Sequence, residues 1–77
     1  MPGAFGKNSQ PPDHDVLGTY EFFDPNGLVA VQRIGEHPSC DVAARASADE
    51  MERRSGGRLL ITAIRRRDQT GWITVPR

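Results

Sequence analysis

A turn signal between two β-rich runs constrains the fold of this chain more than any other feature. Residues 17–23 (LGTYEFF) and 28–34 (LVAVQRI) are rich in aromatic and β-branched side chains, which favour strands. Residues 24–27 between them read Asp-Pro-Asn-Gly. Proline presets φ at the second position of a turn, and Asn-Gly accepts the positive φ that tight turns require. The pattern therefore predicts a β-hairpin over residues 17–34.

Residues 40–55 predict one α-helix, because they contain no glycine or proline and are rich in Ala, Arg, Glu and Met. Ser39 stands at the N-cap position and Asp41 in the first turn, and the two glycines at 56–57 end the helix. The face expected to pack on a sheet carries small or apolar side chains: Cys40, Ala43, Ala44, Ser47, Ala48 and Met51. The other face is charged, and we expect surface ion pairs there, such as Asp41 with Arg45.

A second hairpin follows the helix. Residues 58–66 (RLLITAIRR) predict a third strand, residues 67–71 a turn, and residues 72–75 (WITV) a fourth strand that stops at Pro76. The order is ββαββ, and hairpins pair locally. The sequence therefore predicts an α+β fold: a four-stranded, mainly antiparallel sheet with one helix packed on one face. The order of the two hairpins in the sheet is left open.

Composition divides the chain into a tail and one domain. Residues 1–15 hold three prolines and two glycines and predict a disordered N-terminal tail, which leaves residues 16–77 as a single small α+β domain. A core this small makes self-association a natural source of further stability. The single cysteine, Cys40, cannot form an internal disulfide, and no apolar run approaches the ~20 residues that span a bilayer. We therefore expect a cytoplasmic protein with no membrane partner.

Charge is segregated along the chain, although the total is zero. Residues 1–52 carry nine acidic and three basic side chains, for a net charge of −6. Residues 53–77 carry seven arginines and one aspartate, for a net charge of +6. This asymmetry predicts that the basic end meets an acidic or phosphate-bearing partner. The zero total weighs against non-specific binding of a long duplex.

The candidate binding site lies in this basic third. It combines three consecutive arginines expected at the tip of the second hairpin, two arginines around the Gly-Gly turn, and the tryptophan across the hairpin: Arg65, Arg66, Arg67, Arg58, Arg54 and Trp72. Guanidinium groups bind carboxylates and phosphates through paired hydrogen bonds, and an indole stacks on a base or on an arginine. Since strand side chains alternate, we expect Arg65 and Arg66 on opposite faces. In the alternative interpretation the arginines only keep the chain soluble and Trp72 belongs to the core.

No motif indicates catalysis, a cofactor or a metal. His37 and Cys40 have the spacing of half a zinc site, but structural zinc needs four ligands, and the chain has one cysteine and two histidines. The same two residues could be considered as a catalytic Cys–His pair. The sequence offers no third group to orient the histidine and no glycine loop to stabilise an oxyanion. The Gly-Gly pair lacks the Lys-Ser/Thr of a phosphate loop. The sequence predicts no catalytic residues, no metal ligands and no cofactor.

The aromatic residues of the first strand favour a protein contact. Tyr20 and Phe22 share one face and Phe23 lies on the other, so one face packs on the helix and the other presents an aromatic ring. We therefore expect a small non-enzymatic protein–protein interaction module, acting as a homodimer or as an accessory or inhibitory protein on an unknown partner. The alternative is a nucleic-acid-binding module that uses the arginine-rich second hairpin. An enzyme is the third and least supported class.

Overall fold

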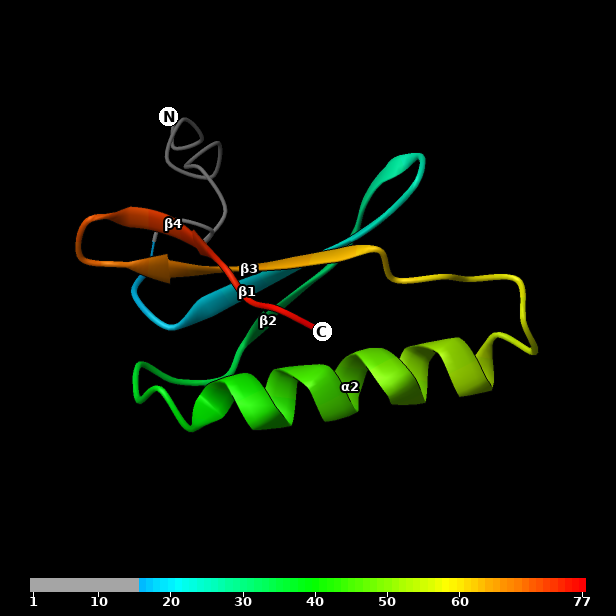
Figure 1. The fold of residues 1–77 in the computed structure, drawn as a ribbon, viewed down its shortest axis with the longest axis horizontal. Helices are drawn as coiled ribbons and strands as arrows, with labels where there is room; N and C mark the ends of the chain where they lie inside the picture. Colours follow the sequence, from blue (N-terminus) through cyan, green and yellow to red (C-terminus); the bar gives the residue numbers. More distant parts are fainter. Residues whose placement is uncertain (1–15) are drawn as a thin grey trace, which may run out of the picture.

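The computed structural model describes residues 16–77, and the predicted tail at residues 1–15 lies outside the described residues. The elements are β1 (Thr19–Asp24), β2 (Gly27–Arg33), α2 (Cys40–Arg54), β3 (Ala63–Asp68) and β4 (Gly71–Thr74). The four strands form one antiparallel sheet in the order β2-β1-β3-β4, and α2 runs along one face of it (Figure 1). The predicted α+β fold is confirmed, and the order places β2 and β4 at the two edges.

The first hairpin forms as its turn chemistry predicts. Asp24 pairs with Gly27, and the Asp24 carboxylate accepts a hydrogen bond from the backbone N–H of Asn26 at 2.7 Å. This local bond is the reason that aspartate favours turns. The ladder shifts by one residue between Phe22 and Phe23, so that Val29 of β2 is an extra residue in a β-bulge.

The core lies between the sheet and the helix. It consists of Tyr20, Phe22, Ala44, Ala48, Ile61, Ile64 and Val75. Ala44 and Ala48 are the two fully buried residues that α2 contributes to it. The predicted helix stripe is confirmed at these two positions and at the partly buried Cys40 and Met51, but it is wrong at Ala43, which is exposed.

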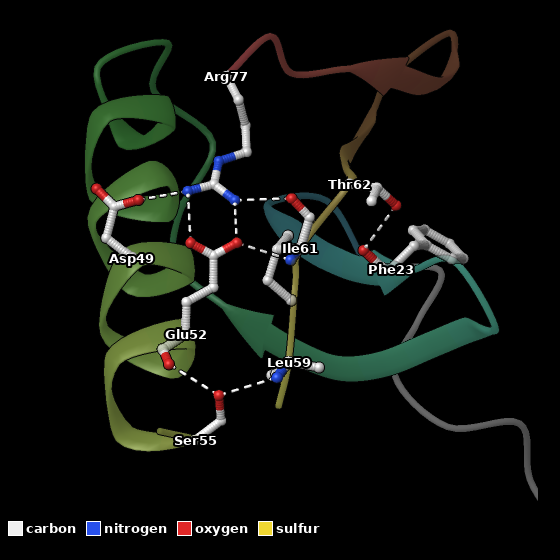
Figure 2. A network of polar contacts seen from close by, with 8 residues as sticks. All are labelled: Phe23, Asp49, Glu52, Ser55, Leu59, Ile61, Thr62 and Arg77. Carbon is white, nitrogen blue, oxygen red and sulfur yellow. Dashed lines mark hydrogen bonds and ion pairs between the residues drawn. The ribbon is translucent and has the colours of Figure 1, made fainter. Parts of the chain in front are cut away.

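The third strand begins later than predicted, at Ala63 rather than at residue 58. The backbone N–H of Leu59 donates to Ser55 Oγ at 2.9 Å, and that of Ile61 donates to Glu52 Oε2 at 2.7 Å (Figure 2). Helix side chains therefore accept the hydrogen bonds that a strand would give to its neighbour. As a result, this segment connects α2 to β3 outside the sheet.

The third strand also ends later than predicted. Arg67 and Asp68 belong to β3, and Asp68 pairs with Gly71, so the turn shrinks to residues 69–70. The three consecutive arginines therefore lie within a strand of the sheet. The expectation that they form the tip of a hairpin is wrong.

Gly18 joins the two hairpins just before β1. Its N–H donates to the carbonyl of Arg67 at 3.1 Å, and its carbonyl accepts from the N–H groups of Ile34 and Gly35 at 3.1 and 3.2 Å. Its φ is +84°, and a Cβ at this position would lie 2.7 Å from the Gly35 carbonyl carbon. Only glycine fits both the backbone conformation and this close approach.

Candidate interaction surface

The sheet has one face against the helix and one face away from it. Tyr20 and Phe22 point toward α2, so Glu21 and Phe23, which alternate with them, point away. Residues paired across a ladder share a face, which adds further side chains. We call this surface the outer face, and define it by Glu21, Phe23, Val31, Arg33, Arg65 and Trp72.

Arg65 is the centre of the outer face. Its Nε donates to Glu21 Oε1 at 2.6 Å, and its Cζ lies 4.5 Å from the ring centroid of Trp72 and 5.3 Å from that of Phe23. The Glu21 side chain is 5% exposed, although it faces away from the helix, whereas that of Arg65 is 43% exposed. The carboxylate and the two rings therefore hold the guanidinium in one place. Trp72 therefore stacks on an arginine, one of the two partners considered for it, and it is not among the buried core residues.

Arg66 points to the helix face, as the alternation predicts. Its Nε lies 3.0 Å from Asp41 Oδ1 and its Nη1 lies 3.2 Å from Asp68 Oδ1, with the Arg66 side chain 11% exposed. Asp41 also accepts the hydroxyl hydrogen of Tyr20 at 2.6 Å. The prediction that Asp41 lies on the solvent side of the helix is wrong, because charged and hydroxyl donors on the sheet draw its carboxylate inward.

This carboxylate shifts the pKa values of the groups around it. Burial, which opposes ionisation, acts to raise the pKa of Asp41, but the hydrogen bonds from Tyr20 and Arg66 outweigh it, and the pKa lies below its ordinary value. Burial, and then the bond to Asp41, raise the pKa of Tyr20. The hydrogen bond to Asp41 also raises the pKa of Arg66. Asp41 and Arg66 are therefore both charged, and the Tyr20 phenol stays neutral. Together the three side chains join α2 to β1 and β3.

The remaining predicted site residues are dispersed. Arg67 donates to the carbonyl of Asp68. Arg54 is 80% exposed and donates to Glu50 Oε2 at 2.7 Å. Arg58 is exposed, and within residues 16–77 it makes no ion pair. The end of α2 near these last two arginines and the β3–β4 turn lie at opposite ends of the molecule (Figure 1). The six predicted residues do not form one surface, and their role in binding stays a prediction.

The edge strand β2 carries a cluster of exposed apolar side chains that the sequence analysis did not single out. Leu28, Val29 and Val31 are 45%, 40% and 37% exposed. They lie within seven residues of one strand, at the edge of the sheet. Their exposure was not predictable while the order of the hairpins was open, since β2 at the centre would have been covered on both sides.

At the opposite edge of the sheet, residues 75–77 cross from β4 to the helix. After β4, Val75 is buried, and Arg77 reaches α2, where it contacts Asp49 and donates to Glu52 Oε2 at 2.9 Å (Figure 2). Arg77 also donates to the carbonyl of Ile61, in the segment between α2 and β3, at 2.7 Å. The hydrogen bonds from Arg77 and from the Ile61 N–H lower the pKa of Glu52. Residues 75–77 thus attach the β4 side of the sheet to the helix.

A small hollow lies beside the end of β3. The hollow, of about 80 Å³, is lined by Leu17, Glu36, Arg67, Asp68 and Gln69, a space for a few waters. Residues 16–77 contain no cluster of three or more His, Cys, Asp or Glu side chains that would hold a metal. His37 Nδ1 lies 2.8 Å from Ser39 Oγ, and the partly buried Cys40 is a free thiol. In the same residues, no helix has the length and apolar character needed to cross a membrane.

Comparison of the chain with family models, with curated proteins and with solved structures gives no match.

Proposed function

We propose that this chain is a small non-enzymatic protein–protein interaction module, which acts as a homodimer or as an accessory or inhibitory protein. The observation that carries the proposal is the exposure of Leu28, Val29 and Val31 along one edge strand. An edge strand with exposed apolar side chains favours pairing with another chain, and such patches mark interaction sites. The binding surface is this edge together with the adjoining outer face.

The aromatic and arginine side chains of the outer face support the same function. Trp and Arg are the residue types that contribute most to binding energy at protein interfaces. Arg65 is already oriented by Glu21, Phe23 and Trp72, so less side-chain freedom is lost when a partner binds. The free thiol of Cys40 supports a reducing, cytoplasmic location.

The nucleic-acid alternative has less support. Phosphate binding needs guanidinium groups that are accessible to solvent. The Arg66 side chain is largely buried with Asp41, and Arg65 is engaged by Glu21. The more exposed Arg54 and Arg58 lie near the far end of the helix. A phosphate-binding groove would have to form from separated arginines.

The test compares a Leu28→Ser/Val31→Ser variant with a Val42→Ser control, which removes an exposed valine from the helix instead. We expect the double variant to lose self-association in light scattering, or cross-linking to another protein from a photoreactive residue at position 29, while the control retains it. Binding of both variants to mixed-sequence DNA and RNA is measured at low and moderate salt. Nucleic-acid binding that survives the double substitution and falls steeply with salt would overturn the proposal.

A further inference from the structure

We infer that the partner of the β2 edge is a second copy of this chain, and this inference rests on the proposed function. The β2 strands of two copies pair antiparallel about a two-fold axis at Val31, perpendicular to the sheet. Two four-stranded sheets then become one continuous sheet. Both helices lie on one side of it and both outer faces on the other, because such an axis keeps each face on its own side.

The two edges of the sheet differ in the way this pairing requires. Edge strands are normally protected by shortness, proline, lysine or inward-pointing charge. β4 has four residues, and Pro76 and Arg77 follow it and bring the chain onto the helix. β2 has seven residues, with no proline or lysine among them. The bulge at Val29 is its one protective feature, and it lies near one end of the strand.

The bulge sets the register. From Ala30 to Arg33 the ladder with β1 is regular, so side chains alternate strictly over this stretch. Opposed residues in an antiparallel pair share a face. An axis at Val31 satisfies this condition, since it opposes Val31 to its own symmetry mate on the outer face. It also opposes Ala30 to Gln32 on the helix face, and it leaves the bulge at the margin of the paired stretch.

The pairing gives the contact an apolar centre and a charged rim. Val31 meets its own mate at the axis. Arg33 of each copy lies opposite Val29 of the other, so that the apolar stem of the arginine covers an exposed valine and its guanidinium stays at the margin. An apolar centre within a polar rim is the usual anatomy of a protein interface.

A symmetric disulfide tests the register. In a Cys40→Ser background, Val31→Cys opposes its own mate across the axis and should form a disulfide-linked dimer under mild oxidation. Val42→Cys, on the exposed helix face, is the matched control and should stay monomeric. Equal cross-linking of the two variants would overturn the inference.

A charge at the axis tests the same pairing. Val31→Asp should raise the dimer dissociation constant roughly tenfold, because two carboxylates would oppose each other across the axis, and Val42→Asp on the exposed helix face should leave it unchanged. A dimer that Thr74→Cys on β4 cross-links, and Val31→Cys does not, would overturn the β2 pairing but keep the proposed function. A protein that stays monomeric at every concentration would overturn the dimer. The proposed function would then stand only if a photoreactive residue at position 29 cross-links to a different protein.

Discussion

Arg66 in β3 donates through Nε to Asp41 Oδ1, in the first turn of α2, at 3.0 Å. The same oxygen accepts the hydroxyl hydrogen of Tyr20, from β1, at 2.6 Å. One carboxylate thus joins the helix to the two central strands. No buried side-chain nitrogen or oxygen in residues 16–77 lacks a hydrogen-bond partner. This network links the helix to the sheet by directional hydrogen bonds, in addition to the apolar packing of Ala44 and Ala48.

Asp41→Asn should destabilise the fold by about 2 kcal/mol, because a charged hydrogen bond contributes about 1.5–3 kcal/mol and its partners stay buried. The measurement is urea unfolding at neutral pH. Glu36→Gln is the control, since Glu36 is exposed and makes no ion pair within the described residues, and it should change stability little. Equal effects of the two substitutions would show that the Asp41 carboxylate does not join the elements.

Acid should weaken the protein through Asp41. Its pKa is lowered in the folded state, where burial is outweighed by the bonds from Tyr20 and Arg66. The unfolded chain therefore binds more protons as the pH falls below about 4, so the stabilisation is present above that range and is lost below it. The stability gap between wild type and Asp41→Asn should narrow from neutral pH toward about pH 3. Urea unfolding at a series of pH values measures it, and curves that stay parallel would contradict the assignment.

Gly18→Ala should cost about 3 kcal/mol, because it combines a positive φ with a Cβ placed against the Gly35 backbone. Gly56→Ala is the matched control. Gly56 also has a positive φ, +68°, but nothing lies within 4 Å of its Cβ position, so only the backbone cost of about 1 kcal/mol applies. Thermal unfolding of the two variants gives the comparison. A smaller loss at Gly18 than at Gly56 would mean that the backbones of Gly18 and Gly35 do not approach closely at the open end of the first hairpin.

The parts of the fold that local chemistry determines were predictable from the sequence. The first hairpin follows from a turn in which the Asp24 carboxylate accepts the Asn26 N–H and Gly27 takes a φ of +134°, and the helix follows from a stretch free of Gly and Pro. The start of β3 was not predictable in this way. Leu59 and Ile61 have side chains that favour a strand, but Ser55 and Glu52 accept hydrogen bonds from their backbone N–H groups. The local sequence does not show that these side chains compete with a neighbouring strand for the N–H groups.

The candidate site was predicted only in part, for a similar reason. Alternation correctly separated Arg65 from Arg66. Their partners, however, are Glu21 and Asp41, which lie 44 and 25 residues away in the chain. Such pairs depend on strand order, which the sequence left open. From the sequence alone, three consecutive arginines indicate an accessible basic cluster. In the structure, Glu21 and Asp41 from the acidic part of the chain bind two of these arginines.

Arg77→Ala should lower stability by about 1 kcal/mol, since it removes bonds to Glu52 and to the Ile61 carbonyl that attach the end of the chain to the helix. Arg53→Ala is the control, because within residues 16–77 the Arg53 side chain pairs with Glu50 on its own helix, at the surface. Hydrogen exchange at the Ile61 amide adds a local readout, since Glu52 accepts that hydrogen bond. Faster exchange in Arg77→Ala alone is expected. Equal exchange in both variants would contradict the contact.

Arg65→Gln should change both stability and the fluorescence of Trp72, the single tryptophan of the chain. The substitution removes a cation 4.5 Å from the indole and the guanidinium partner of the buried Glu21. We expect a loss of about 2 kcal/mol and a shifted emission maximum. Arg65→Lys should recover only part of both, because an ammonium cannot match the planar fork that a carboxylate and two rings enclose. Arg58→Gln, at an exposed site, should change neither. If Arg65→Gln left emission and stability at the wild-type values, the outer face would lack the ordered arginine that makes it a rigid binding surface.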